Sequence, residues 1–256
     1  MILDKIVETK KEEVAQAKRN IPLADLQDTI KKLDPCRNFK EAISGNSCRI
    51  IAEVKCASPS RGRLVENFDP VKIAMTYEKN GAAAISVLTD EKYFEGHKKY
   101  LTQIRREIRL PLLRKDFIID PYQIYESRAI GADAVLLIVS ILGAKLGDFI
   151  ALARELGLAA LTEVHTAAEL EIALAAGADI IGVNNRKLDT FVTDINTCKE
   201  LARLIPAGKI IVAESAIFTR ADIENIQEAG ISAFLIGEAL VTAPDIGGKL
   251  RELRGM

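Results

Sequence analysis

The stretch IGADAVLLIV (residues 130–139) places a turn of small residues directly before a run of apolar side chains. The same arrangement recurs in NGAAAISVL (80–88), AGADIIGVN (176–184) and AGISAFLIG (229–237), with glycines about 50 residues apart. Each copy follows a segment with helical periodicity. We therefore expect each glycine to end a helix in the left-handed conformation just before a strand begins.

Four further apolar runs alternate with these copies: IIAEVK (50–55), LPLLRK (110–115), AALTEV (159–164) and KIIVAES (209–215). Eight short strands rich in Val, Ile and Leu, separated by helices, indicate a parallel sheet covered by helices. About 210 residues from the first strand onward fit a TIM (βα)8 barrel. No GxGxxG motif follows the first strand, which argues against a doubly wound dinucleotide-binding sheet.

The predicted domain organisation is a single α/β domain over residues 1–256. Residues 1–46 carry helix signals and form an N-terminal helical extension, which we expect to lie across one mouth of the barrel. The barrel itself occupies about residues 47–256.

Composition excludes several classes of protein. A formal net charge of -1 leaves no basic stripe for nucleic acid. The longest apolar stretch, at 134–144, is far shorter than the roughly 20 residues that span a bilayer. The first 18 residues lack the apolar core of a signal peptide, so we expect a cytoplasmic protein. Four cysteines without a CxxC pair and two histidines give little material for a metal site, so we expect no structural metal.

Polar side chains occupy the C-terminal ends of five predicted strands. Residues i and i+2 of a strand share a face, and on one such face apolar or small residues give way to polar ones toward the strand end. Barrel active sites gather at this end, and unpaired buried charges are costly, so function is the better reason for them. The candidate catalytic residues are Glu53, Lys55, Lys115, Glu163, Asn184 and Glu214. His165 is left unassigned, and Arg114, Asp116 and Cys56 fall on the opposite phase, where packing or surface roles are expected.

Two loops suggest what this site binds. Barrels of this type often hold phosphate on backbone N–H groups after strands seven and eight, where Ser215, Ala216, Gly237 and Glu238 stand. An apolar slot for a planar ring could be lined by Phe94, Phe117 and Leu188 beside Pro59.

Six segments carry a family resemblance: AEVKCASPSRG (52–62), LTDEKYFEG (88–96), LLRKDFIID (112–120), LTEVHT (161–166), IGVNNRKL (181–188) and VAESAI (212–217). In order and over essentially the whole chain, they resemble the motifs of indole-3-glycerol phosphate synthase, a βα-barrel lyase of tryptophan biosynthesis. The resemblance implies ring closure of 1-(2-carboxyphenylamino)-1-deoxyribulose 5-phosphate, a sugar phosphate with an anthranilate ring, with loss of carbon dioxide and water and without metal or cofactor.

The resemblance also implies residue roles. Lys115 corresponds to a general acid at the ketone oxygen and Glu163 to a general base, while Glu53 and Lys55 form the accompanying pair. Which lysine serves ring closure and which serves dehydration stays open. Asn184 and Arg186 match residues that hold substrate hydroxyl and carboxylate groups. Glu214 and Ser215 match the strand-seven carboxylate and the phosphate-site serine, and Ser58 belongs to the loop that closes over the substrate.

Two expectations concern fine detail. Alanine at position 216 replaces the family's usual glycine, and we expect that only its N–H is used, so that no positive φ is required there. We also expect desolvation or a second ammonium in the pocket to lower a catalytic lysine's pKa, and at least one carboxylate to have a raised pKa in the substrate complex.

Two rival functions use parts of the same pattern. A Schiff-base aldolase would also employ a buried strand-end lysine beside carboxylates. A non-catalytic phosphate-binding barrel would keep the phosphate loops but would have no use for Lys115 or Glu163. The sequence does not determine the oligomeric state, and a monomer is the starting hypothesis.

Overall fold

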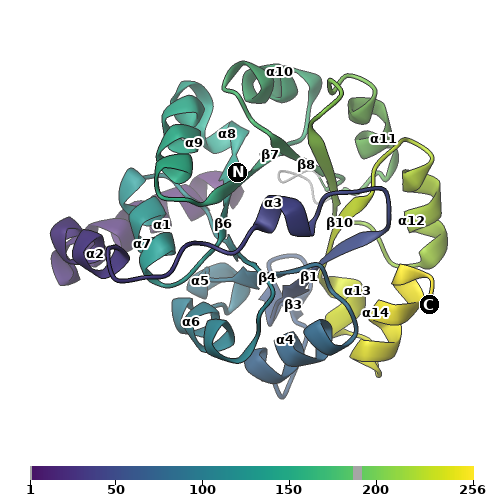
Figure 1. The fold of residues 1–256 in the computed structure, drawn as a ribbon, viewed down its shortest axis with the longest axis horizontal. Coiled ribbons are helices and arrows are strands. Elements are labelled where there is room, and N and C mark those ends of the chain that lie inside the picture. The colour runs from purple at the N-terminus through teal and green to yellow at the C-terminus, as the bar shows by residue number, and fades with distance from the viewer. Residues whose placement is uncertain (1, 187–191) are drawn as a thin grey trace.

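A closed barrel of eight parallel strands forms the centre of the computed structural model, which describes residues 2–186 and 192–256 (Figure 1). Around the barrel the strand order is β1-β10-β9-β8-β7-β6-β5-β4, with β4 closing onto β1. The strands are β1 (Arg49–Val54), β4 (Ala84–Leu88), β5 (Leu112–Lys115), β6 (Ala134–Ile138), β7 (Ala159–Val164), β8 (Ile180–Asn184), β9 (Ile210–Glu214) and β10 (Ala233–Ile236). All eight predicted strands, and the TIM-barrel fold class, are confirmed.

Helices surround the barrel and bury its outer face. After the extension they are α4 (Pro70–Lys79), α5 (Glu91–Phe94), α6 (Lys98–Glu107), α7 (Pro121–Ala129), α8 (Val139–Leu142), the 3-10 turn η1 (Gly143–Lys145), α9 (Leu146–Glu155), α10 (Ala167–Ala175), α11 (Asn196–Ala202), α12 (Arg220–Gln227), α13 (Glu238–Val241) and α14 (Ile246–Arg254). Side chains cap several N-termini: Asp69, Asp120, Thr166 and Thr219 each accept a backbone N–H.

The repeated glycines mark where helices end and strands follow. Gly81, Gly131, Gly177 and Gly230 all have positive φ, between 79° and 94°. Glycine adopts this left-handed conformation without the steric cost that a Cβ atom brings. The repeat in the sequence is thus the repeated turn that leads into every second strand.

The N-terminal extension contacts both mouths of the barrel, so the expectation that it covers one mouth is wrong. It comprises α1 (Ile2–Asn20), α2 (Leu23–Ile30) and α3 (Phe39–Ala42). Phe39 and Ile43 are fully buried against the first residues of the strands, and α3 lies over the barrel centre in Figure 1. Ile6 of α1 instead lines a cavity together with Phe117, which follows the C-terminal end of β5. The extension therefore packs against one end of the barrel through α3 and lines the cavity at the other end through α1.

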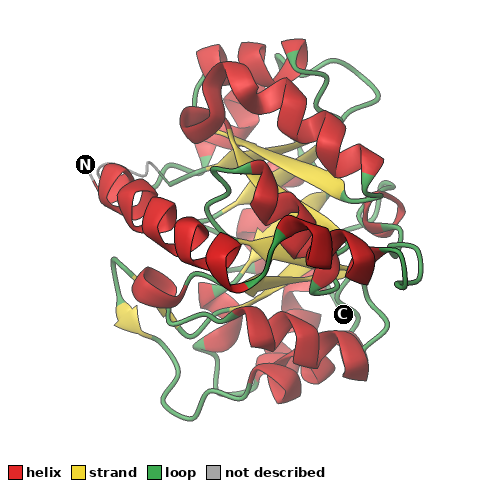
Figure 2. Cartoon of the chain, turned by 90° about the vertical axis from the view of Figure 1, so that its left-hand side faces the viewer, coloured by secondary structure: helices red, strands yellow, loops and turns green. Residues whose placement is uncertain are grey.

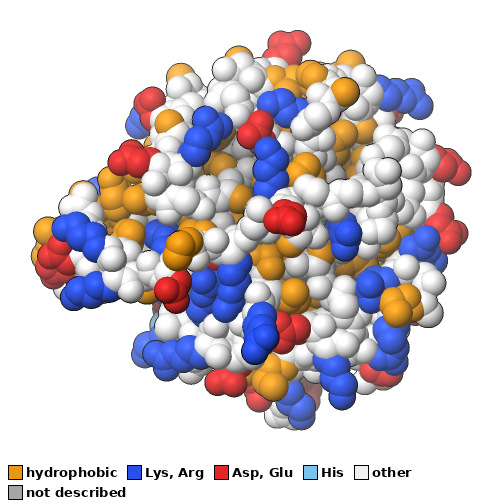
Figure 3. All heavy atoms as spheres, in the orientation of Figure 1, with side chains coloured by type: hydrophobic (Ala, Val, Ile, Leu, Met, Phe, Trp, Pro, Cys, Tyr) orange, Lys and Arg blue, Asp and Glu red, His pale blue; other side chains and the backbone are white. Residues whose placement is uncertain are grey.

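The loop after β1 contains a two-stranded hairpin, β2 (Ala57–Ser58) and β3 (Gly62–Arg63), that the sequence did not indicate. In Figure 2 the start of the long helix α1 lies on the same side of the barrel as this hairpin. Acidic and basic side chains are interspersed over the face shown in Figure 3. Within the described ranges, no helix combines the length and apolar character needed to cross a membrane.

Candidate active site

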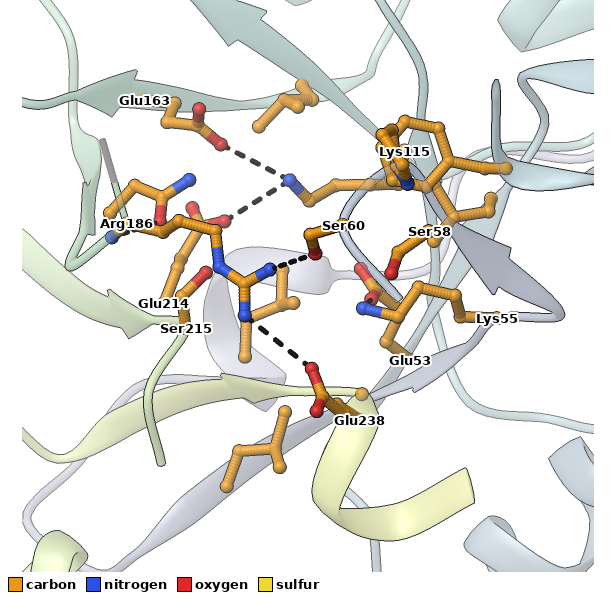
Figure 4. Close-up of a pocket in the computed structure, with 18 of the residues that line it drawn as sticks. Glu53, Lys55, Ser58, Ser60, Lys115, Glu163, Arg186, Glu214, Ser215 and Glu238 are labelled. Atoms are coloured by element: carbon orange, nitrogen blue, oxygen red, sulfur yellow. Dashed lines mark hydrogen bonds and ion pairs between the residues drawn. The ribbon is translucent and has the colours of Figure 1, made fainter. Parts of the chain in front are cut away.

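A cavity opens at the C-terminal mouth of the barrel, where the polar strand ends meet (Figure 4). The cavity volume is about 140 Å³, within about 1140 Å³ of atom-free space that includes open solvent. The structure brings together at this cavity all the predicted site residues that it describes: Glu53, Lys55, Ser58, Pro59, Phe94, Lys115, Phe117, Glu163, Asn184, Arg186, Glu214, Ser215, Ala216, Gly237 and Glu238. Leu188 lies outside the described residues.

Lys115 occupies the centre of the charged group. Its Nζ atom lies 3.2 Å from Oε2 of Glu163 on β7 and 3.3 Å from Oε2 of Glu214 on β9, and Figure 4 shows it pointing between them. Both carboxylate side chains are 2% exposed, whereas that of Lys115 is 15% exposed and faces the cavity. An ammonium is thus presented to any molecule in the cavity, with two carboxylates behind it.

The three groups titrate differently because of where their neighbours lie. Burial lowers the pKa of Lys115, but the charges of Glu163, Glu214 and Glu53 outweigh burial and hold this pKa well above its usual range. Burial raises the pKa of Glu163, but Lys115 and His165 outweigh it and the net shift is downward. Burial dominates at Glu214, and with the charge of Glu163 it raises this pKa to about 8 against the pull of Lys115.

The expectation of a lowered lysine pKa is therefore wrong for Lys115. Its nearest charged groups are the carboxyl groups of Glu163 and Glu214, and a carboxylate within ion-pair distance favours the ammonium form. The expected raised carboxyl pKa in the substrate complex stays a prediction.

Glu53 and Lys55 form a second ion pair, with 2.9 Å between Oε1 and Nζ. Glu53 fits only because residue 237 has no side chain, since a Cβ atom at Gly237 would overlap the Glu53 carboxylate. Gly182 on β8 has the same relation to Glu214. A glycine inside or just after a strand often marks a close approach by another group. In the sequence, this sign was used at Gly237 but not at Gly182.

Arg186 links the loops that surround the cavity. One guanidinium nitrogen donates to Ser60 Oγ at 2.9 Å, and another lies 3.5 Å from Oε2 of Glu238. Arg61 approaches the other oxygen of Glu238 at 2.8 Å. The Glu238 side chain, expected to matter only for its backbone N–H, therefore connects the loop after β1 to the loop after β8, as Figure 4 shows for Ser60, Arg186 and Glu238.

Ser215 and Ala216 have φ angles of 65° and 59°. The expectation that position 216 needs no positive φ is wrong: alanine here adopts a conformation that costs an L-residue roughly 1–2 kcal/mol. Two successive residues in this conformation turn the chain sharply just past Glu214, and Asn185 holds the turn by donating from Nδ2 to the Ser215 carbonyl.

Apolar side chains form one wall of the cavity. The rings of Phe94 and Phe117 lie 6.0 Å apart between centroids. Ile2, Leu3 and Ile6 of α1 complete this wall. The sequence reading missed the contribution of α1, because helical periodicity identifies an apolar face but not the surface that it meets.

The residues on the opposite strand phase form a buried network. Arg114 and Asp116 are 2% and 4% exposed and paired at 3.0 Å, so the helix-facing alternative is right and the surface alternative is wrong. Cys56 is buried, which agrees with the packing role expected for it.

His165 lies behind the cavity, with Nε2 3.4 Å from Oε1 of Glu163. No group of three or more His, Cys, Asp or Glu side chains within residues 2–186 and 192–256 is placed to hold a metal ion.

The chain is similar to known proteins over nearly its whole length. The family model described as indole-3-glycerol phosphate synthase matches residues 3–253. The chain is 50% identical over 256 residues to an indole-3-glycerol phosphate synthase of Alkaliphilus metalliredigens, covering 99% of this chain and 98% of the relative. It is also 50% identical to one of Roseiflexus castenholzii, with the same coverage.

Among solved structures, a 3-hexulose-6-phosphate synthase from Salmonella typhimurium superposes with a TM-score of 0.67. That match covers 81% of this chain and 97% of the other at 15% identity, so it concerns the barrel fold alone. With the family model spanning nearly every residue and relatives at half identity over their full length, the chain belongs to the indole-3-glycerol phosphate synthase family of carboxy-lyases.

Proposed function

We propose that this cavity converts 1-(2-carboxyphenylamino)-1-deoxyribulose 5-phosphate to indole-3-glycerol phosphate, carbon dioxide and water by lysine and glutamate acid–base catalysis. The observation that carries the proposal is the ammonium of Lys115, held by Glu163 and Glu214 at the edge of a cavity with an apolar wall. A charged donor, a carboxylate base and a slot for a planar ring are the three elements that this reaction requires.

Lys115 serves as a general acid. Ring closure adds an aromatic carbon to a ketone, and the ketone oxygen must receive a proton as it becomes a hydroxyl group. A lysine whose pKa is raised is fully protonated at neutral pH, and its ammonium also stabilises the developing negative charge on oxygen. Lys55 with its partner Glu53 provides a second ammonium in the same cavity, and either lysine can assist the later loss of the hydroxyl group.

Glu163 serves as a general base. Dehydration to the indole requires removal of a proton from the carbon next to the ring nitrogen. A base must be ionised to accept it, and the lowered pKa of Glu163 keeps this carboxylate ionised at neutral pH. Glu214, with its pKa near 8, is mostly protonated there, so the two carboxyl groups take different roles.

The rest of the cavity suits the other groups of this substrate. Arg186 and Asn184 would hold carboxylate and hydroxyl groups, and Ser58 closes over them. The turn at Ser215 and Ala216, with Gly237 and Glu238, would receive the phosphate, and Phe94, Phe117 and Pro59 would flank the anthranilate ring. The Arg186 guanidinium lies at the cavity and contacts Ser60 and Glu238, which also line it. Arg186 is therefore within reach of a substrate carboxylate bound there.

A Schiff-base aldolase is disfavoured by the same charges. Imine formation needs a neutral amine as the nucleophile. Its carboxylate neighbours, Glu163 foremost, hold Lys115 as an ammonium instead, which makes attack on a carbonyl slow.

The test is an indole-fluorescence assay with the proposed substrate on wild type, Lys115→Ala and Glu163→Ala. Each variant should lose about two or more orders of magnitude in kcat. The exposed residues Lys31 and Glu8 supply the matched controls Lys31→Ala and Glu8→Ala, which should retain full activity. A well-folded wild type that forms no product would overturn the proposal, and borohydride trapping with a ketose phosphate would then test the aldolase.

A further inference from the structure

His165 stands between two carboxylates behind the cavity. Its Nε2 atom lies 3.4 Å from Oε1 of Glu163, and its Nδ1 atom lies 3.3 Å from Oε2 of Glu169. Glu169 comes from the first turn of α10 and also accepts the backbone N–H of His165 at 2.7 Å, which fixes the two residues relative to each other. The imidazole thus lies within ion-pair distance of both the proposed base and a second carboxylate.

Exposure rises along this row of side chains. That of Glu163 is 2% exposed, that of His165 10% and that of Glu169 20%. On the cavity side, Glu163 meets Lys115, which a bound substrate would cover. The row therefore connects the buried base to the surface by a path that does not pass through the cavity.

The proposed reaction needs such a connection because it takes up more protons than the substrate releases in the site. The ketone oxygen takes up two protons before it leaves as water, and the ring releases one to the base. The substrate carboxylate leaves as neutral carbon dioxide, so each turnover consumes one proton. The proton on Glu163 can return to Lys115 over 3.2 Å, but the second must come from solvent.

We propose that His165 and Glu169 form a proton relay that supplies this second proton to Glu163 and Lys115 from the α10 side of the barrel. This inference rests on the proposed function. In the relay, the imidazolium passes its Nε2 proton to Glu163 Oε1, and Glu163 passes a proton to Lys115. The neutral ring keeps its proton on Nδ1, so it is recharged by turning about its Cβ–Cγ bond: the bare Nε2 then faces Glu169 and takes the proton that Glu169 receives from water.

The electrostatics of the row agree with this role. Burial lowers the pKa of His165, but its contact with Glu169 and the charges of Glu163, Glu169 and Glu214 outweigh burial, and the net shift is upward. This upward shift favours the protonated ring, which is the form that can act as the donor. The acidic side chains near the ring are Glu163 on β7, Glu169 on α10 and Glu214 on β9.

The first test reads the ring directly and does not depend on turnover. The chain has two histidines, His97 and His165, so a His97→Asn background leaves a single imidazole for NMR titration. His97 accepts the Lys99 N–H as the cap of α6, and asparagine can replace that acceptor. In this background, Glu163→Gln and Glu169→Gln should each lower the pKa of His165 by about one, as loss of an adjacent carboxylate does. If neither changes it, the relay is excluded.

The second test measures turnover. His165→Ala and Glu169→Gln should each lower kcat by about tenfold or more with KM within about twofold, because substrate contacts are unchanged. Imidazole added to His165→Ala should restore most of the lost kcat. His97→Asn should match wild type. A kcat within twofold of wild type in His165→Ala, or a loss that imidazole does not restore, would overturn the relay, whereas an inactive wild type would instead count against the proposed function.

Discussion

Glu163 and Glu214 share one cation, since Lys115 Nζ lies 3.2 Å from the first and 3.3 Å from the second. The other contacts of the two side chains differ. Glu163 also faces His165, whereas Oε1 of Glu214 has no hydrogen-bond partner among the described residues. One pKa is therefore lowered and the other raised to about 8. Near-identical distances to one lysine thus give a base and a mostly neutral acid.

This difference predicts unequal effects of two isosteric substitutions. Glutamine cannot ionise, so Glu163→Gln removes the proposed base and should lower kcat by about 100-fold or more at pH 7. Glu214→Gln replaces a side chain that is already mostly neutral at that pH and should cost less than about tenfold. Steady-state kinetics with the proposed substrate measures both. Equal losses at pH 7 would contradict the assignment.

The raised pKa of Glu214 also predicts how its effect on stability depends on pH. Because this pKa is about 8 in the folded state against an ordinary value of 4.5, the folded protein binds more protons between these pH values, and its stability falls as pH rises through them. Glu214→Gln lacks this titration. From pH 5 to pH 8, the free energy of unfolding of wild type should fall by more than about 1 kcal/mol relative to the variant in urea titrations. Parallel pH profiles would show that Glu214 titrates normally.

Gly237 should tolerate no side chain. A Cβ atom there would overlap the Glu53 carboxylate and displace it from Lys55, so Gly237→Ala should lower kcat/KM by about tenfold or more. Gly147 is the matched control, because no atom lies within 4 Å of a Cβ at this helical position and alanine favours helix. Gly147→Ala should keep full activity and unfold at equal or higher urea concentration. Full activity in Gly237→Ala would mean that the position of Glu53 is not critical.

The sequence predicted the strands and their polar ends because both depend on local patterns. Period-two alternation places Glu53, Glu163 and Glu214 on one face whatever surrounds them. The pKa direction of Lys115 could not be predicted in this way, since it follows from distances across three strands. The contact of Ile6 with the cavity could not be predicted either, because the position of α1 depends on how the whole barrel folds. The φ of Ala216 was missed since alanine gives no sign of a left-handed turn, which glycine would have given.

The last prediction concerns Lys10, which ties α1 to the strand ends. Its Nζ lies 2.9 Å from both Asp90 and Asp116, and all three side chains are at most 3% exposed. Lys10→Met leaves the buried Asp90 without its cation and Asp116 with Arg114 alone, and it should destabilise the protein by about 3–5 kcal/mol in urea unfolding. Because Asp116 directly follows Lys115, kcat should also fall in the folded variant. Lys11→Met, at the exposed neighbouring position paired with Glu8, should change stability by less than about 1 kcal/mol. Similar small effects from both would show that this buried network does not hold α1 in place.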